Sequence, residues 1–238
     1  GFIGTVYYLI ERYTSWMLTK IIAVSKSELD RALEDKLVPV EKIGLVENGI
    51  DLAVLDKEIN KEEKKAELKV KKDQKVVGMI ARLSQQKAPE IFVEAMSDLL
   101  NEREDIYCYL AGSGPSQDTI KDLIAERGFE EKIHLLGYRD DVHELLQITD
   151  VFVLPSRYEG LPFTLLEAMA FSVPVVVTNA TGNRDVIKHN ENGILVEIDD
   201  VIAIKNAVSQ ILNDAELANT LSKNAKKTVL ESYTVKQM

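Results

Sequence analysis

The sequence contains few of the residues that build disulfide-linked or metal-binding domains. Its 238 residues include one cysteine, Cys108, and three histidines. A single cysteine excludes an internal disulfide, and its place in an apolar run predicts a small buried side chain in a reducing compartment. His134, His143 and His189 have no cysteine or carboxylate neighbours at metal-ligand spacing. We therefore expect them to be structural or surface residues, and we expect no metal site.

Positive charge and long apolar runs are also scarce. The 29 basic and 39 acidic residues give a formal net charge of −10. Such a surface argues against non-specific nucleic-acid binding and is not attracted to an anionic membrane. No apolar run approaches the length of a transmembrane helix, and the first residues lack the basic region of a signal peptide. Because the chain starts at Gly1 without an initiator Met, we expect a piece of a longer protein.

From residue 75 onward, short apolar runs alternate regularly with longer segments expected to be helical. The runs predict buried strands at residues 76–81, 106–111, 133–136, 151–154, 174–178 and 194–196. Two helices, at about 200–213 and 215–231, are expected to finish the chain. This pattern predicts an α/β fold with a Rossmann-like, doubly wound, mostly parallel sheet. Since each loop of interest follows a strand, these loops gather on one rim of the sheet, where ligands bind.

The first 75 residues are less regular. Residues 2–18 predict an aromatic-rich helix packed on a core, rather than a membrane-interface helix, because too few basic residues are present. Strands are expected at 21–24 and 43–46, and Ser25-Lys26-Ser27-Glu28 fits a capping box that starts a helix. The Lys- and Glu-rich residues 57–75 predict a solvated helix or a spacer.

Two carboxylates, Glu159 and Glu167, stand eight residues apart between the strands at 151–154 and 174–178. The stretch predicts a loop followed by a helix, whose free N-terminal N–H groups suit a phosphate. Carboxylates bind sugar hydroxyls through charge-assisted hydrogen bonds. A sugar–phosphate ligand is therefore the hypothesis for this rim. The alternatives are that Glu167 forms a capping box with Thr164 and that Glu159 lies in an exposed turn.

Three further features lie on the same rim. Arg82 and Lys87 could neutralise a diphosphate or could be two surface cations. Gly112-Ser113-Gly114 forms a turn that lets a ligand come close, or a tight turn without a ligand. It is not a dinucleotide fingerprint, because Gln117 stands where the third glycine would be. Asp185 could cap the helix that starts near it or could line the pocket.

Taken in order, these motifs resemble the C-terminal, donor-binding half of the family-4 retaining glycosyltransferases of GT-B fold. The E-x7-E pair Glu159 and Glu167 carries the resemblance, which covers about residues 20–233. Supporting pieces are Arg82 with Lys87, Gly112-Ser113-Gly114, Asn48-Gly49-Ile50-Asp51 and Asn192-Gly193-Ile194-Leu195-Val196. Thr181-Gly182-Asn183-Arg184-Asp185 resembles a variant of bacterial capsule and exopolysaccharide transferases. Many relatives have Glu at the position of Asp185.

The resemblance implies a role for each rim residue. Arg82 and Lys87 would bind the diphosphate of a nucleotide sugar, with UDP-sugar favoured over GDP-sugar, and Glu167 would bind the ribose. Glu159 would face the donor sugar, so that Glu159, Arg82 and Lys87 form the catalytic set. The other implied substrate contacts are Gly160, Leu161, Pro162, Phe163, Thr164, Leu165, Gly112, Ser113, Gly114, Tyr138 and Arg139. Tyr138 and Arg139 would lie against the base. Such enzymes keep the anomeric configuration and need no metal cofactor.

The resemblance also implies a division of the chain. Residues 1–37 would be the end of an N-terminal acceptor domain and a linker, and residues 38–238 the donor-binding domain. With most of the acceptor domain missing, we expect this chain to bind donor weakly and to transfer little or nothing. We expect a cytoplasmic protein of polysaccharide or glycoconjugate synthesis, with peripheral membrane association through the missing half left open. The alternatives are a phosphorylase or epimerase of the same fold, and a non-catalytic nucleotide-binding or assembly module.

Overall fold

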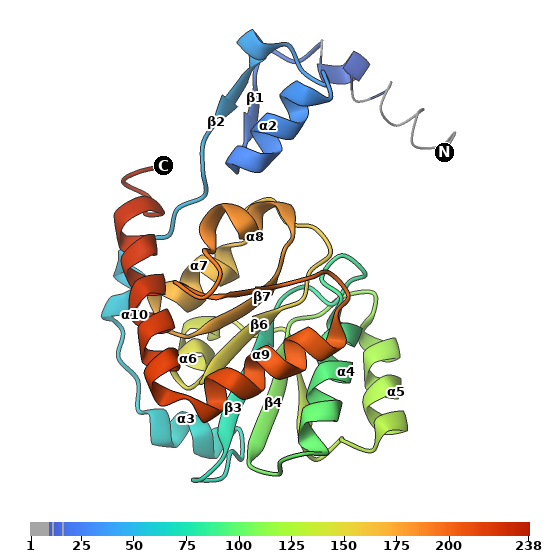
Figure 1. Ribbon diagram of the computed structural model, residues 1–238, viewed down its shortest axis with the longest axis vertical. Coiled ribbons are helices and arrows are strands. Elements are labelled where there is room, and N and C mark those ends of the chain that lie inside the picture. The colour runs from blue at the N-terminus through green and yellow to red at the C-terminus, as the bar shows by residue number, and fades with distance from the viewer. Residues whose placement is uncertain (1–9, 11, 16) are drawn as a thin grey trace.

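The computed structural model describes residue 10, residues 12–15 and residues 17–238. The helix expected at residues 2–18 falls largely outside the described residues. Figure 1 shows a small N-terminal part above a larger α/β part, with the C-terminus near the place where they meet. Among the described helices, none is both long enough and apolar enough to span a membrane.

The larger part is built on a six-stranded parallel sheet of order β5-β4-β3-β6-β7-β8. The strands are β3 (Lys75–Ile80), β4 (Ile106–Ala111), β5 (Ile133–Gly137), β6 (Val151–Leu154), β7 (Val175–Thr178) and β8 (Ile194–Val196). The order runs outward in opposite directions from the neighbouring strands β3 and β6, which makes this pair the topological switch point of the sheet. The predicted doubly wound α/β fold is confirmed.

Helices cover both faces of this sheet (Figure 1). They are α3 (Lys61–Glu67), α4 (Pro89–Leu100), α5 (Gln117–Arg127), α6 (Val142–Gln147), α7 (Phe163–Ala170), α8 (Thr181–Val186), α9 (Val201–Asn213) and α10 (Ala215–Ser232). Each face has its own core. Val76 and Phe152 belong to one core, and their sequence neighbours Val77 and Val151 belong to the other. This alternation follows from strand geometry, and burial on both faces explains why the strands are continuous apolar runs.

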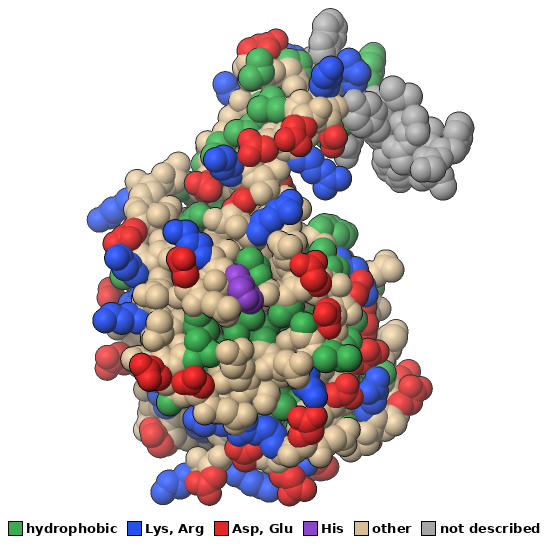
Figure 2. All heavy atoms as spheres, in the orientation of Figure 1, with side chains coloured by type: hydrophobic (Ala, Val, Ile, Leu, Met, Phe, Trp, Pro, Cys, Tyr) green, Lys and Arg blue, Asp and Glu red, His purple; other side chains and the backbone are tan. Residues whose placement is uncertain are grey.

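The expectation that Cys108 is a small buried side chain is confirmed. Cys108 lies in β4, is fully buried and has no disulfide partner among the described residues. Burial raises the pKa of its thiol, so the side chain behaves as an apolar one. At the surface, Figure 2 shows Lys and Arg side chains interspersed with Asp and Glu over the visible face.

The small part pairs β1 (Ile21–Ala23) in parallel with β2 (Ile43–Leu45) and packs α2 (Lys26–Glu34) against them. Ser25 caps α2 by accepting a hydrogen bond from the Glu28 N–H at 3.3 Å. The other half of the expected capping box is different, because the Glu28 carboxylate accepts from the Val24 N–H. The domain boundary at residue 37 falls between the two paired strands and stays a prediction. The 3-10 helices η1 (Val40–Lys42) and η2 (Leu52–Asp56) complete the N-terminal quarter.

Candidate functional site

A pocket of about 530 Å³ opens on the rim where β3, β4 and β5 end and α7 begins. Its lining residues are Ile80, Ala81, Arg82, Ala111, Gly112, Ser113, Gly114, Tyr138, Arg139, Val142 and Thr164. The structure therefore brings seven of the predicted site residues to one place. The other eight, Lys87, Glu159, Glu167, Leu165 and residues 160–163, lie beyond this lining.

The turn after β4 needs its two glycines. A Cβ atom at Gly112 would lie 2.0 Å from the carbonyl oxygen of Ala81, and one at Gly114 would lie 2.2 Å from that of Leu83. Gly112 also has a φ of +134°, which other residues rarely adopt. The Leu83 N–H donates to the Ser113 carbonyl at 3.0 Å, so the two rim loops meet backbone to backbone. The two glycines are therefore required for the packing of the two loops, and their lack of side chains also leaves room for a ligand.

The two predicted cations are in different states. Arg82 is exposed on the pocket and makes no ion pair within the described part of the chain. Lys87 Nζ lies 2.5 and 2.7 Å from the two carboxylate oxygens of Glu159. The Glu159 side chain is 4% exposed and that of Lys87 is 18% exposed. Glu159 is therefore not in an exposed turn but is a buried carboxylate with one cation.

Backbone contacts hold the loop that carries Glu159. The Gly182 N–H of α8 donates to the Glu159 carbonyl at 3.0 Å, and the Arg157 N–H donates to the Gln86 carbonyl at 2.8 Å. The Gln86 side chain in turn donates to the Tyr158 carbonyl. The loops after β3 and β6, which carry Lys87 and Glu159, are thereby held together across the switch point.

Helix α7 presents its first turn to this rim. Pro162 is its N-cap and supplies no side-chain hydrogen bond. Helix geometry leaves the N–H groups of Phe163, Thr164 and Leu165 without an intrahelical acceptor, which creates a place for an anion. The side chains of Leu161 and Leu165 belong to the core, so only their backbone can face a ligand.

Glu167 does not cap α7, so the capping box considered with Thr164 is wrong. Its carboxylate oxygen Oε1 accepts from His143 Nε2 at 3.1 Å instead. This contact gives His143 a structural role, as expected, with a partner that the sequence did not indicate. The contact joins α6 to α7 over 24 residues of sequence. The packing of α6 against α7 creates this contact, so a local sequence pattern does not predict it.

The family described as "Glycosyl transferases group 1" matches residues 60–228. The chain belongs to this family. The family predicted from the rim motifs, and its GT-B-type fold, are confirmed.

Known relatives of this glycosyl transferase group 1 chain are longer than it is. It is 30% identical over 234 residues to the UDP-Gal:alpha-D-GlcNAc-diphosphoundecaprenol alpha-1,3-galactosyltransferase of Escherichia coli, covering 97% of this chain and 60% of that protein. It is 27% identical over 241 residues to the capsular polysaccharide biosynthesis glycosyltransferase CapM of Staphylococcus aureus, covering 98% and 63%. The chain therefore spans about 60% of these relatives' length.

Solved structures agree on the fold. The structure of Anabaena HepE in complex with UDP-glucose matches with a TM-score of 0.84 and 24% sequence identity. The match covers 91% of this chain and 60% of that one. The likeness concerns the arrangement of helices and strands in this glycosyl transferase group 1 domain.

A buried lysine holds the loop that carries Arg139. Arg139 donates to Asp141 and to Glu67, and Lys64 Nζ lies 2.7 Å from oxygens of both Asp141 and Glu67. Lys64 also lies 2.9 Å from Glu144, and its side chain is only 9% exposed. The expectation of a solvated helix is therefore wrong at this residue. The lysine joins α3 to the loop that carries Arg139.

The same contacts lower the pKa values of three carboxyls. Hydrogen bonds from Arg139 and then Lys64 hold the pKa of Asp141 well below its usual range. Lys64 and Arg139 lower the pKa of Glu67, and Lys57 and Lys64 lower that of Glu144. A carboxyl with a lower pKa in the folded than in the unfolded chain stabilises the fold above its unfolded pKa. That contribution is lost as pH falls through the folded value.

We therefore expect the free energy of unfolding to decrease as pH falls from about 5 to about 2. Urea denaturation at stepped pH measures this. Lys64→Met removes the shared cation and should make the pH dependence shallower. Lys61→Met is the matched control, because Lys61 lies exposed on the same helix and has no ion pair among the described residues. Equal pH dependence in both variants would show that the Lys64 contacts are not its source.

Asp185 takes neither of the two roles considered for it. It lies near the end of α8 and accepts hydrogen bonds from the Ser27 N–H, at 2.8 Å, and from the Ser27 hydroxyl. Asn48 Nδ2 donates to the Leu161 carbonyl at 2.7 Å. A Cβ at Gly160 would lie 2.8 Å from Glu28 Oε1. The small N-terminal part therefore sits directly on the loop after Glu159.

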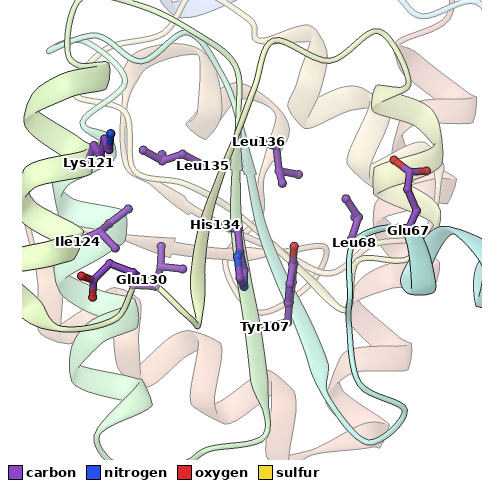
Figure 3. Close-up of a pocket in the computed structure, with 10 residues that line it drawn as sticks. Glu67, Leu68, Tyr107, Lys121, Ile124, Glu130, His134, Leu135 and Leu136 are labelled. Carbon is purple, nitrogen blue, oxygen red and sulfur yellow. The ribbon is translucent and has the colours of Figure 1, made fainter.

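A second hollow, of about 390 Å³, lies beside the edge strand β5 and shares no lining residue with the rim pocket (Figure 3). Tyr107 and His134 stack in it with ring centroids 4.3 Å apart, and burial lowers the pKa of His134. None of the predicted site residues lines it. In residues 10, 12–15 and 17–238, no three His, Cys, Asp or Glu side chains gather as a metal site would need. The rim pocket is therefore the candidate site of this glycosyl transferase group 1 domain.

Proposed function

We propose that this chain supplies the donor site of a retaining hexosyltransferase. The enzyme would transfer a sugar from a UDP-sugar to an acceptor in polysaccharide or glycoconjugate synthesis. One observation carries the proposal. The rim at the switch point combines Arg82, which has no ion pair with any described residue, the N-terminus of α7, which has no side-chain cap, and the carboxylate of Glu167. These groups match a diphosphate followed by a ribose.

In this proposal, Arg82 and the first-turn N–H groups of α7 bind the diphosphate, and Glu167 binds ribose hydroxyls. Tyr138 and Arg139 lie on the base side of the pocket. Lys87 reaches the diphosphate when phosphate oxygens compete with Glu159 for its ammonium group. Two named relatives support UDP as the nucleotide: the E. coli enzyme is named for UDP-Gal, and the HepE structure contains UDP-glucose.

The chemistry follows from the charges on this rim. When the bond between the anomeric carbon and the diphosphate breaks, negative charge grows on the leaving oxygen. Arg82, Lys87 and the helix N-terminus would place positive charge beside that oxygen, and such charge lowers the barrier. Glu159 and the backbone of residues 160–163 face the sugar. The acceptor would be bound by a further domain. Residues 1–37 would be the end of that acceptor domain and a linker, and residues 38–238 would form the separate donor domain.

Calorimetric titration with UDP, GDP and ADP tests the proposal. UDP should bind most tightly, and Glu167→Gln should weaken UDP binding at least about tenfold, because a hydrogen bond to a charged group contributes about 1.5–3 kcal/mol. Glu126→Gln is the control, since Glu126 is exposed near the end of α5, at the opposite edge from the rim. If none of the three nucleotides binds or raises the unfolding temperature, the donor-site proposal fails and a non-catalytic assembly role gains.

A further inference from the structure

We infer that His143 is a positioning residue for nucleotide binding, whose imidazole holds the Glu167 carboxylate in the orientation that receives the ribose. The inference rests on the proposed donor site. The imidazole Nε2–H donates to Glu167 Oε1 at 3.1 Å. Among the described residues the Glu167 carboxylate makes no other hydrogen bond or ion pair. Its second oxygen is therefore available for a ligand hydroxyl.

His143 is itself held from two directions. Its ring packs against Phe171, with centroids 5.6 Å apart and a tilt of 32°. It is the second residue of α6, and Lys64 binds Asp141, two residues before it, at 2.7 Å and Glu144, the next residue, at 2.9 Å. Because α6 is held in place, His143 can hold the Glu167 carboxylate of α7 in one orientation.

The benefit of this contact concerns conformational freedom. The Glu167 side chain is 21% exposed, and a glutamate without a partner samples several rotamers that binding must then restrict. A carboxylate that is already held avoids this cost. The effect should appear only with ligands that carry the ribose hydroxyls, because other parts of the nucleotide do not contact Glu167 in the proposed site.

Two variants of His143 separate positioning from bulk. Gln places an amide N–H near the position of Nε2, whereas Asn places the same group near Nδ1 and does not reach Glu167. The ligands are UDP and 2′,3′-dideoxy-UDP, measured by calorimetry on the whole chain. His134→Asn is the matched control, since His134 lies in the hollow around β5 and not on the rim. If His143→Asn does not fold, His143→Leu serves for the same comparison.

We expect His143→Asn to weaken UDP binding about fivefold and to leave binding of the dideoxy analogue within about twofold. His143→Gln and His134→Asn should bind both ligands within about twofold of the unmodified chain. If the unmodified chain does not bind UDP, the donor-site proposal and this inference both fail. If UDP binds but His143→Asn leaves it unchanged, or weakens both ligands equally, only the positioning role fails.

Discussion

Replacing Lys87 by Met is expected to lower the free energy of unfolding by about 3 kcal/mol, because the Glu159 carboxylate loses the one cation that it contacts among the described residues while it stays buried. The Glu159 side chain is 4% exposed, and the ammonium nitrogen contacts both of its oxygens. A pair so shielded from water differs from exposed surface pairs, which contribute at most about 1 kcal/mol. Urea denaturation of both chains measures the loss.

The double variant tests whether the isolated charge is the cause. Adding Glu159→Gln to Lys87→Met should restore most of the lost stability, since the buried charge is then gone. The two single variants should also differ in their effect on UDP binding. Lys87→Met should weaken UDP binding about tenfold, whereas Glu159→Gln frees Lys87 for the diphosphate and should not weaken it. Equal stability of Lys87→Met and the double variant would contradict this account of the pair.

Gly182→Ala is the second substitution with a large expected effect. A Cβ atom there would lie 1.5 Å from the Gly160 carbonyl oxygen and 2.3 Å from its carbon. Both are backbone atoms, so the loop after β6 must move, and overpacking of this kind costs about 3 kcal/mol. The Gly182 N–H also donates to the Glu159 carbonyl, so the shift should displace Glu159. The expected result is a lower unfolding free energy together with weaker binding of UDP-sugar.

Gly44→Ala is the matched control for this substitution. Its added Cβ would meet only the end of the Lys20 side chain, at 3.9 Å. We expect Gly44→Ala to change stability by less than about 1 kcal/mol. If Gly182→Ala were as stable as Gly44→Ala in urea and bound UDP-sugar normally, α8 would not be what holds the Glu159 loop.

The sheet could be predicted from the sequence because its cause is local. Strands such as β6 (VFVL) and β7 (VVVT) are covered on both faces, so they are short and almost wholly apolar runs. The rim position of Glu159 and Glu167 followed from the strand on one side and the helix on the other. The glycines of the turn after β4 were also visible, although their contacts with Ala81 and Leu83 were not.

The partners of the charged side chains could not be predicted, because they come from distant parts of the chain. Lys87 and Glu159 are 72 residues apart, and Ser27 and Asp185 are 158 apart. Lys64 stood in a stretch of alternating charges, where nothing distinguished it from its exposed neighbours. Only the docking of α3 against α6 buries it. Such pairs depend on how helices and strands pack against one another, whereas a local sequence pattern predicts only the single helix or strand in which it lies.

A crystal structure of the chain with UDP tests the central claim most directly. The account predicts the diphosphate within hydrogen-bond distance of Arg82 and of the first-turn N–H groups of α7, with the ribose hydroxyls on the Glu167 carboxylate. Lys87 should have turned from Glu159 toward the phosphates. UDP bound in the hollow around β5, or on the rim with its ribose away from Glu167, would contradict it.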